Sequence, residues 1–442
     1  MNHSWRPSCN PTADAFRSKI LPVRERAEVR NKWLKQRLDQ VLPELMAREG
    51  FDMWIIIPRP YIPDPVLATI VPEPMLSTVN FGEMLVFNLC KDGSVERLAI
   101  GQTYEIGPLY KSVRGNEGTE DKFKLLGRIV RERNPKTIGV NVSENFPHGD
   151  GLTHSQYEKL ARALGPEYMP RVKGAERLSV GWLERRIQPE IDAYSGILEI
   201  AHALIKEAFS SRVILPGVTT TYDVMWWFRQ KMLDMGLEAW FQPIVMLQAV
   251  DVPLLPLNMM TTVERVDGGR TLILPGDLLH CDIGFTYLGL STDTQEDAYV
   301  LKLGEDDAPE GLKASLATAN RLQDIVIGEF VAGRTGNQIS AAAKEKAENE
   351  GIKAMVYCHP IGFHGHGAGP LIGSAYKKGP LPGPGDYPLF ENTCHSIELN
   401  ISKNVPEWND KEVRIGVEEN AVFMDGKVRW LAGRQTEFHL IG

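Results

Sequence analysis

The chain has 442 residues, which is more than one ordinary domain needs, so two domains are expected. Hydrophobic residues make up 43% and charged residues 24% of it, a composition typical of soluble globular proteins. The net charge of −8 argues against nucleic acid or an anionic membrane surface as a partner.

The N-terminal part of the chain alternates between helical and strand patterns. Apolar residues recur with a 3.6-residue period over 24–50, which predicts a helix that stops at Gly50. Thr153 and Gln156 have the spacing of a capping box at the start of a later helix. Strands are predicted at 53–57, 84–89 and 137–142, and further helices at 121–133 and 153–164. Such alternation predicts an α/β domain.

A boundary is predicted over 166–189, where prolines and glycines are frequent. It separates two predicted domains, 1–180 and 186–442. Beyond it the pattern changes to a long helix from Glu190 and a second helix that ends near Gly236.

This pair of helices recurs further along the chain. A long helix at about 308–330 is followed by another that ends at Gly351. Gly217-Val218-Thr219 and Gly333-Arg334-Thr335 precede the second helix of each pair, and each pair leads into a strand-rich segment. An internal duplication of this kind predicts a pseudo-twofold domain with its site where the two halves meet.

Four acidic residues lie within apolar strand patterns of the C-terminal half. Asp282 and Asp293 are eleven residues apart across a turn, as on adjacent arms of a hairpin. Glu398 and Glu418 each lie in the middle of a later strand pattern. A carboxylate in such a place is costly unless it is paired or binds a cation. Oxygen ligands in this number suit Mn²⁺, Mg²⁺ or Co²⁺ better than a thiolate-seeking metal.

The order Asp, Asp, His, Glu, Glu, with the histidine in a glycine-rich turn, resembles the peptidase family of methionine aminopeptidase, prolidase, aminopeptidase P and creatinase. Three short motifs are also typical of it: Gln-Pro-Glu-Ile at 188–191, Pro-Gly-Val-Thr at 216–219 and Pro-Gly-Asp-Leu at 275–278. The resemblance covers nearly all of 185–442 and, more loosely, the N-terminal part. It implies a creatinase-type α/β domain followed by a C-terminal pita-bread domain.

The resemblance also implies a metal site. Asp282, Asp293, Glu398 and Glu418 would bind one or two divalent ions, expected to be Mn²⁺ with Co²⁺, Zn²⁺ or Fe²⁺ as other candidates. In the family the metals activate a water that attacks a carbonyl, and Glu398 would also act as general acid or base.

The position of the metal-binding histidine is open within the segment 359–373. One alignment makes His366 the ligand. Another gives His366 a substrate-side position and puts Pro370, which cannot bind metal, at the ligand position, so that metal binding would be weak or absent. Seven residues beyond the ligand the family has a further histidine, and this position is Gly373 in the first alignment and Lys377 in the second.

Two further histidines are candidates for catalysis beside His366 and Glu398. His280 lies two residues before Asp282 and therefore on the same strand face, where it would replace a missing ligand or act as a base. His364 shares a face with His366 if that segment is extended.

Five scattered cysteines without a CxxC pair indicate a reducing compartment, and we expect a cytoplasmic protein: Cys9, Cys90, Cys281, Cys358 and Cys394. No stretch approaches the roughly 18 apolar residues that span a bilayer, so no membrane association is expected. Family members commonly dimerise, and the aromatic residues Trp226, Trp227 and Trp240 exceed the needs of a core, so a homodimer is predicted.

Three functions remain open from the sequence. The first is a metal-dependent hydrolase resembling Xaa-Pro aminopeptidases and dipeptidases, which cleaves a short peptide or a peptide-like amide. The second is a metal-free, creatinase-like C–N hydrolase or lyase acting on a small substrate. The third is a catalytically silent homologue that binds peptides.

Overall fold

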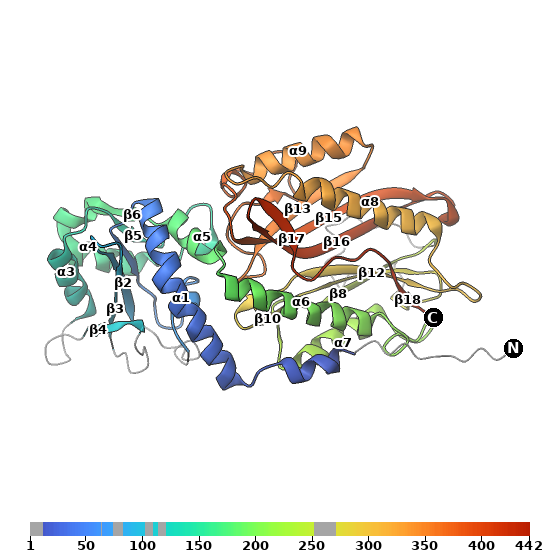
Figure 1. Ribbon diagram of the computed structural model, residues 1–442, viewed down its shortest axis with the longest axis horizontal. Coiled ribbons are helices and arrows are strands. Elements are labelled where there is room, and N and C mark those ends of the chain that lie inside the picture. Colours follow the sequence, from blue (N-terminus) through green and yellow to red (C-terminus); the bar gives the residue numbers. More distant parts are fainter. Residues whose placement is uncertain (1–11, 63, 74–82, 102–108, 114–120, 252–270) are drawn as a thin grey trace.

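The computed structural model describes residues 12–62, 64–73, 83–101, 109–113, 121–251 and 271–442. They form an N-terminal α/β domain and a larger C-terminal domain, which lie side by side in Figure 1. Within the described residues, no helix has both the length and the apolar character to cross a membrane.

A mixed six-stranded sheet forms the centre of the N-terminal domain, in the order β4-β3-β2-β1-β5-β6. Its strands are β1 (Met53–Ile56), β2 (Met84–Leu89), β3 (Val95–Ile100), β4 (Lys111–Val113), β5 (Ile138–Val140) and β6 (Val172–Gly174). The central strand β1 is antiparallel to β2 and parallel to β5. All four residues of β1 are buried, which explains why its sequence is a continuous apolar run.

Helices flank this sheet: α1 (Val23–Glu49), α2 (Leu67–Ile70), α3 (Lys122–Arg133), α4 (His154–Tyr168) and α5 (Glu176–Glu184). As predicted, α1 ends at Gly50, whose φ of 73° is one that glycine adopts at little cost. The predicted capping box at α4 is wrong. The Thr153 side chain caps no N–H group there, and the buried Gln156 donates its amide to the Pro58 carbonyl oxygen at 3.4 Å instead.

The C-terminal domain begins with α6 (Gln188–Ala208) and contains two helix pairs, α6 with α7 (Thr221–Asp234) and α8 (Glu310–Ile327) with α9 (Gly336–Asn349). Gly217 and Gly333 have φ values of 83° and 85°, and each stands shortly before the second helix of its pair. Thr220 and Thr335 then cap α7 and α9 through capping boxes. Both second helices therefore begin with a threonine capping box, but the cap of the first pair is Thr220 rather than the Thr219 of the predicted repeat, so the two glycine-threonine motifs differ by one residue.

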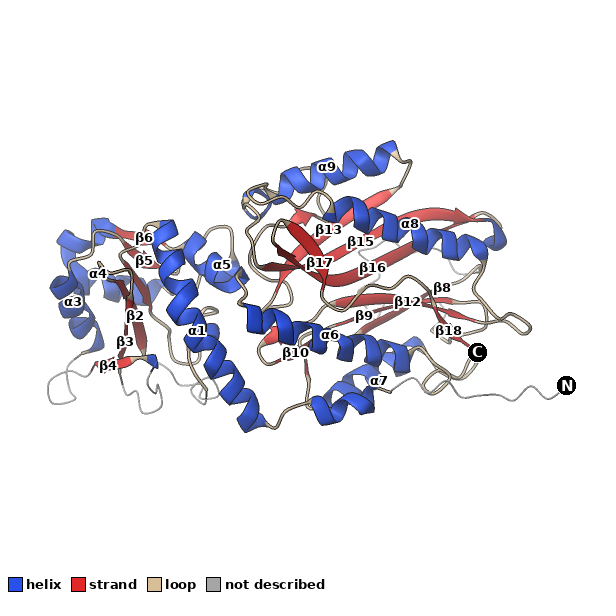
Figure 2. Cartoon of the chain, viewed as in Figure 1, coloured by secondary structure: helices blue, strands red, loops and turns tan. Residues whose placement is uncertain are grey.

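A long sheet runs through this domain in the order β14-β13-β15-β16-β12-β9-β8 (Figure 2). Its strands are β8 (Ile244–Gln248), β9 (Leu278–Ile283), β12 (Thr294–Val300), β13 (Ala354–Ile361), β14 (Ile372–Gly373), β15 (Thr393–Val405) and β16 (Lys411–Met424), with β17 (Lys427–Trp430) beside β16 and β18 (His439–Ile441) beside β12. A small sheet contains β7 (Glu238–Ala239), β10 (Phe285–Tyr287) and β11 (Leu290–Ser291). The strands that follow each helix pair meet where β12 lies next to β16.

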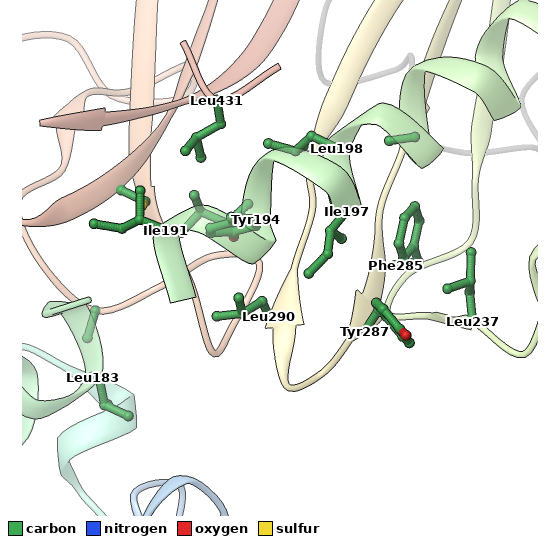
Figure 3. Packing of buried hydrophobic residues seen from close by; sticks show 14 of the residues in the cluster. Leu183, Ile191, Tyr194, Ile197, Leu198, Leu237, Phe285, Tyr287, Leu290 and Leu431 are labelled. Atoms are coloured by element: carbon green, nitrogen blue, oxygen red, sulfur yellow. The ribbon is translucent and has the colours of Figure 1, made fainter. Parts of the chain in front are cut away.

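The helices cover one face of the long sheet and leave the other for the site. Ile191, Tyr194, Ile197 and Leu198 of α6 pack in one cluster with Phe285 and other strand residues (Figure 3). Each such buried side chain contributes roughly 1.5–3 kcal/mol relative to an exposed one. Side chains alternate along a strand, so the residues between those that face the helices point to the opposite face.

Candidate metal centre

Four side chains form one row across the middle of the long sheet. Gln295 of β12 is paired in register with Asp282 of β9 on one side and with Glu418 of β16 on the other. Glu418 is paired in turn with Glu398 of β15. Cross-strand partners lie ~4.5–5.5 Å apart at Cβ and share a face. The register therefore forces three carboxyl groups and one carboxamide together.

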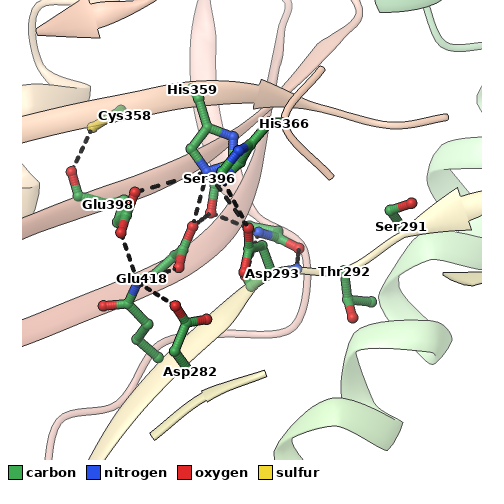
Figure 4. A network of polar contacts seen from close by, with 12 residues as sticks. Asp282, Ser291, Thr292, Asp293, Cys358, His359, His366, Ser396, Glu398 and Glu418 are labelled. Carbon is green, nitrogen blue, oxygen red and sulfur yellow. Dashed lines mark hydrogen bonds and ion pairs between the residues drawn. The ribbon is translucent and has the colours of Figure 1, made fainter. Parts of the chain in front are cut away.

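Asp293 and His359 complete this carboxylate cluster (Figure 4). The backbone of Asp293 is fixed by Asn420, whose amide donates to the Asp293 carbonyl oxygen at 2.7 Å and accepts from its N–H at 3.2 Å. The Nε2 atom of His359 lies 3.1 Å from Glu418 Oε1, 3.6 Å from Asp293 Oδ2 and 3.8 Å from Glu398 Oε2. All four acids predicted from the sequence are thus brought together, with His359 among them.

The backbone sets the tautomer of His359. Its Nδ1 atom lies 3.0 Å from the carbonyl oxygen of Pro360, and a carbonyl oxygen only accepts, so Nδ1 carries a proton. In the neutral ring Nε2 then presents its lone pair to the carboxylates. Metal-bound histidines are typically held in this way through their other nitrogen.

The electrostatics of the cluster fit a divalent cation. Burial raises the pKa of Asp282, Asp293 and Glu398, and the neighbouring charge of Glu418 raises each pKa further. One buried oxygen each of Asp282 and Asp293 has no hydrogen-bond partner among the described residues. Within that part of the chain, the ion pairs of these carboxylates are all with histidines. A divalent cation supplies the charge and the oxygen contacts that such a group needs.

The ligand-type atoms converge in neighbouring groups. His359, Glu398 and Glu418 offer atoms that all lie within 4.8 Å of one another, and so do Asp282, Asp293 and Glu418. The two groups share Glu418. The residues present therefore fit the divalent metal that the sequence predicts.

His366 lies at the outer edge of the cluster. Its Nε2 atom is 3.9 Å from Asp293 Oδ2, and its ring packs edge-on against His359 at 4.6 Å and Trp240 at 5.3 Å between ring centroids. Its side chain is 73% exposed, whereas that of His359 is 7% exposed. The structure thus gives His359 the inner position and His366 the outer one, where the predicted ligand His366 still offers an atom within 4.8 Å of those of Asp293 and His359.

Sequence reasoning missed His359 although a signal for it was present. His359 and His366 are seven residues apart, which is the spacing that the resemblance implies between the ligand histidine and a second histidine. Both alignments placed the metal-binding position in the glycine-rich turn. His359 lies before that turn, inside β13 and opposite Ser396 of β15. With His359 facing the carboxylates, Pro370 is not required at a ligand position.

The two other histidines occupy different environments. His280 borders the same cavity, and its Nδ1 atom lies 2.9 Å from Asp297 Oδ1. Burial alone would lower its pKa, but Asp297 raises the pKa overall. It belongs to none of the convergent ligand groups found in the described residues.

His364 stacks on His148 with ring centroids 4.3 Å apart and lines a different cavity. The structure therefore does not bring His364 into the cluster.

A cavity of about 310 Å³ opens onto the carboxylate cluster. Its walls include Trp240, Phe241, Ile244 and Tyr357, and the acids line its floor together with His366. An apolar pocket with a few convergent polar groups is the usual form of a small-molecule site.

A second group of ionisable residues lies on the helix-covered face of the same strands. His202 of α6 has its Nε2 atom 2.9 Å from Glu419 Oε2 and 3.9 Å from Glu296 Oε1. His439 of β18 pairs with the other oxygen of Glu296. Because Glu296 and Glu419 are the chain neighbours of Gln295 and Glu418, these ion pairs fix the strands behind the carboxylate cluster.

Comparisons with known proteins agree with this fold. The family model described as metallopeptidase family M24 matches residues 195–427. The X-Pro aminopeptidase from Thermotoga maritima MSB8 has a TM-score of 0.62 at 17% identity, covering 90% of this chain and 99% of that one. The Xaa-Pro dipeptidase from Bacillus anthracis has a TM-score of 0.58 at 14% identity, covering 94% and 100%.

A third similar structure is not described as a peptidase. The N-terminal domain of FACT complex subunit SPT16 from Cicer arietinum (chickpea) has a TM-score of 0.54 at 11% identity, covering 91% of this chain and 96% of that one. No curated protein matches the sequence. At such identities the similarities show the fold, and activity has to be argued from the site.

Proposed function

This chain belongs to metallopeptidase family M24, and we propose that it is a metal-dependent hydrolase that cleaves short peptides or peptide-like amides of the Xaa-Pro type. The observation that carries the proposal is the convergence of four carboxyl groups, which line a single cavity, with the buried imidazole of His359. All five residues lie inside the stretch that matches the family.

The proposed metal ligands are His359, Asp293, Glu398, Glu418 and Asp282. Carboxylate oxygens predominate in this set, which favours Mn²⁺ over metals that prefer thiolates. When bound, the ion lowers the pKa of a water molecule and polarises the carbonyl group that the water attacks.

Glu398 is the proposed proton carrier. Its side chain is 16% exposed, against 4% for Asp293 and 1% for Glu418, so it faces the cavity most openly of these three acids. A carboxyl group there takes a proton from the attacking water and returns it to the leaving amine.

His366 is proposed to contact the substrate. Its exposed ring stands at the cavity wall beside Trp240, with its inner face against His359. From there it can donate a hydrogen bond to the oxygen on which negative charge develops during the attack. His280 is held by a hydrogen bond with Asp297, and it is proposed to orient the neighbouring carboxyl group of Asp282 in the cavity.

The cavity supports a small substrate. Its volume of about 310 Å³ lies near the lower end of the range for small-molecule sites. Aromatic walls suit an apolar or cyclic side chain such as proline. The similar structures of an X-Pro aminopeptidase and an Xaa-Pro dipeptidase support the same substrate class.

The test is hydrolysis of a panel of Xaa-Pro dipeptides and Xaa-Pro-Xaa tripeptides by protein purified without chelator. We expect turnover that chelation abolishes and Mn²⁺ restores, and that Glu398→Gln loses while remaining folded. Turnover that survives chelation would instead support the creatinase-like reaction. If the protein shows neither metal uptake nor turnover, the result would support the catalytically silent homologue that binds peptides.

A further inference from the structure

We propose that Gln295 makes this centre mononuclear, because its carboxamide takes the place of a second metal between Asp282, Glu398 and Glu418. The inference rests on the proposed function and specifies it: one divalent ion binds beside His359, the amide contacts the oxygens of Glu398 and Glu418 that face away from His359, and Asp282 is not a ligand of that ion.

The amide nitrogen of Gln295 lies among three carboxylate oxygens. Nε2 is 2.6 Å from Glu398 Oε1, 2.7 Å from Glu418 Oε2 and 3.4 Å from Asp282 Oδ2. The NH₂ end of the side chain, and not its carbonyl oxygen, faces these carboxylate oxygens, which accept its hydrogen bonds. The amide supplies two N–H groups, and these match the two short contacts.

The two glutamates divide their oxygens between this amide and His359. Glu398 directs Oε1 to Gln295 and Oε2 toward His359 Nε2, at 3.8 Å. Glu418 directs Oε2 to Gln295 and Oε1 to His359, at 3.1 Å. The cluster therefore has an imidazole half and an amide half, joined by both glutamates.

The imidazole half is a complete ligand set by itself. It combines the lone pair of His359 with one oxygen each of Asp293, Glu398 and Glu418. One nitrogen and three carboxylate oxygens are enough to hold a divalent ion and leave positions for water and substrate. The amide half offers the other oxygens of the same two glutamates together with Asp282, but the Gln295 amide already contacts all three residues.

The register of the sheet fixes the backbone of Gln295 between the acids. Gln295 stands in the row between Asp282 and Glu418, and β12 is hydrogen-bonded to a strand on each side. Gln295 as a whole is only 5% exposed. An ion binds carboxylate oxygens at roughly 2.0–2.3 Å, so it cannot share the space between these oxygens with an N–H donor. A second ion would have to turn the amide over or displace it.

A short side chain at position 295 would open this space. Threonine suits a strand interior and is too short to reach Glu398, so Gln295→Thr removes the amide while it keeps the backbone pairing. Gln295→Ala serves the same purpose if the threonine variant does not fold. His202→Gln is the control, because it alters the ionisable group on the other face of the sheet and changes no residue that lines the cavity.

The experiment measures Mn²⁺ binding by calorimetry and the electron paramagnetic resonance spectrum at one and at two equivalents. We expect the parent and His202→Gln to bind one ion, with the six-line spectrum of isolated Mn²⁺. We expect Gln295→Thr to bind two, the second at least roughly tenfold more tightly than any second ion in the parent, with a spectrum broadened by coupling between the ions.

Each outcome separates the inference from the proposed function. Two tightly bound, coupled ions in the parent would overturn the inference and leave the metal-dependent hydrolase in place. One ion in both the parent and Gln295→Thr would also overturn it, because the amide would then not be what excludes the second ion. A parent that takes up no Mn²⁺ at millimolar concentration would overturn the proposed function and the inference together.

Discussion

His359 is the residue on which the chemistry of the site depends most directly. It is the imidazole whose Nε2 atom faces three carboxylates, and its other nitrogen is held by the Pro360 carbonyl oxygen. Removing it takes away the nitrogen ligand and leaves the acids with less to compensate their charge.

We expect His359→Ala to weaken Mn²⁺ binding by roughly a hundredfold, at the upper end of what ligand-supporting residues contribute. His366→Ala is the matched control, and it should change Mn²⁺ affinity by less than about threefold while lowering kcat, since His366 lies at the exposed edge. Calorimetry and steady-state kinetics measure both. A larger loss of Mn²⁺ affinity in His366→Ala than in His359→Ala would make His366 the ligand and His359 the supporting residue.

Glu184, at the end of α5, is a buried acid in the segment expected as a linker. Its Oε1 atom accepts a hydrogen bond from the Tyr387 hydroxyl at 2.8 Å, and burial raises its pKa to about 8. A carboxyl group with a raised pKa stabilises the fold below its unfolded pKa of about 4.3, and that contribution is lost as the pH rises toward 8.

The free energy of unfolding should therefore fall by on the order of 3 kcal/mol between pH 5 and pH 8 through this one residue. Glu184→Gln keeps an acceptor for Tyr387 and cannot ionise, so it should be the more stable form at pH 8. Denaturant unfolding of both proteins at the two pH values checks this. An equal pH dependence in both would show that other groups cause it.

Among the elements, the N-termini of α9 and α4 offer a direct comparison. Thr335 accepts from the Gln338 N–H at 3.2 Å and caps α9, whereas the Thr153 side chain caps no N–H group of α4. We expect Thr335→Ala to lower the free energy of unfolding by ~1 kcal/mol, and Thr153→Ala to change it far less. Urea titration of the two variants measures these free energies of unfolding. Equal decreases in both variants would contradict the assignment of the caps.

At the scale of the whole molecule, a buried ion pair joins the two domains. Arg37 of α1 donates to Glu190 of α6 at 3.0 Å, and both side chains are 1% exposed. The guanidinium group also lies over the rings of Trp182 and Phe363, at 4.4 and 4.8 Å. This contact fixes the N-terminal helix against the first helix of the C-terminal domain.

Arg37→Ala should lower the free energy of unfolding by roughly 3 kcal/mol, the lower end for a broken buried pair, because Glu190 keeps only the more distant Arg186 at 3.7 Å. Arg24→Ala removes an exposed i,i+4 pair with Glu28 on the same helix and should cost less than ~0.5 kcal/mol. Thermal unfolding of the variants measures the difference. Similar shifts in both would mean that the domains do not depend on this pair.

The homodimer and the cytoplasmic location stay predictions. Trp226 on α7 is 49% exposed, and Leu233 on the same helix is 68% exposed. We expect light scattering at micromolar concentration to give twice the chain mass of 49.4 kDa. A monomer mass would contradict the dimer.

The sequence by itself was enough to predict these helices and strands and to single out the four acids of the site. The 3.6-residue periods of α1 and α6, the apolar run of β1 and the glycine at the end of α1 act over a few residues, so they can be recognised locally. The four acids were recognisable because a charge inside an apolar strand needs a reason wherever the strand lies. Family membership followed from the order of these residues.

Only the tertiary structure decided which side chains meet. The pairing of β13 with β15 brings His359, rather than Pro370, to the carboxylates, and the pairing of β12 with both β9 and β16 inserts Gln295 between Asp282 and Glu418. Strand register is set by contacts between segments far apart in the chain, and a shift by one residue turns every side chain to the other face. Local patterns therefore predicted a site with four acids. The pairing of strands far apart in the chain added His359 and Gln295 to it.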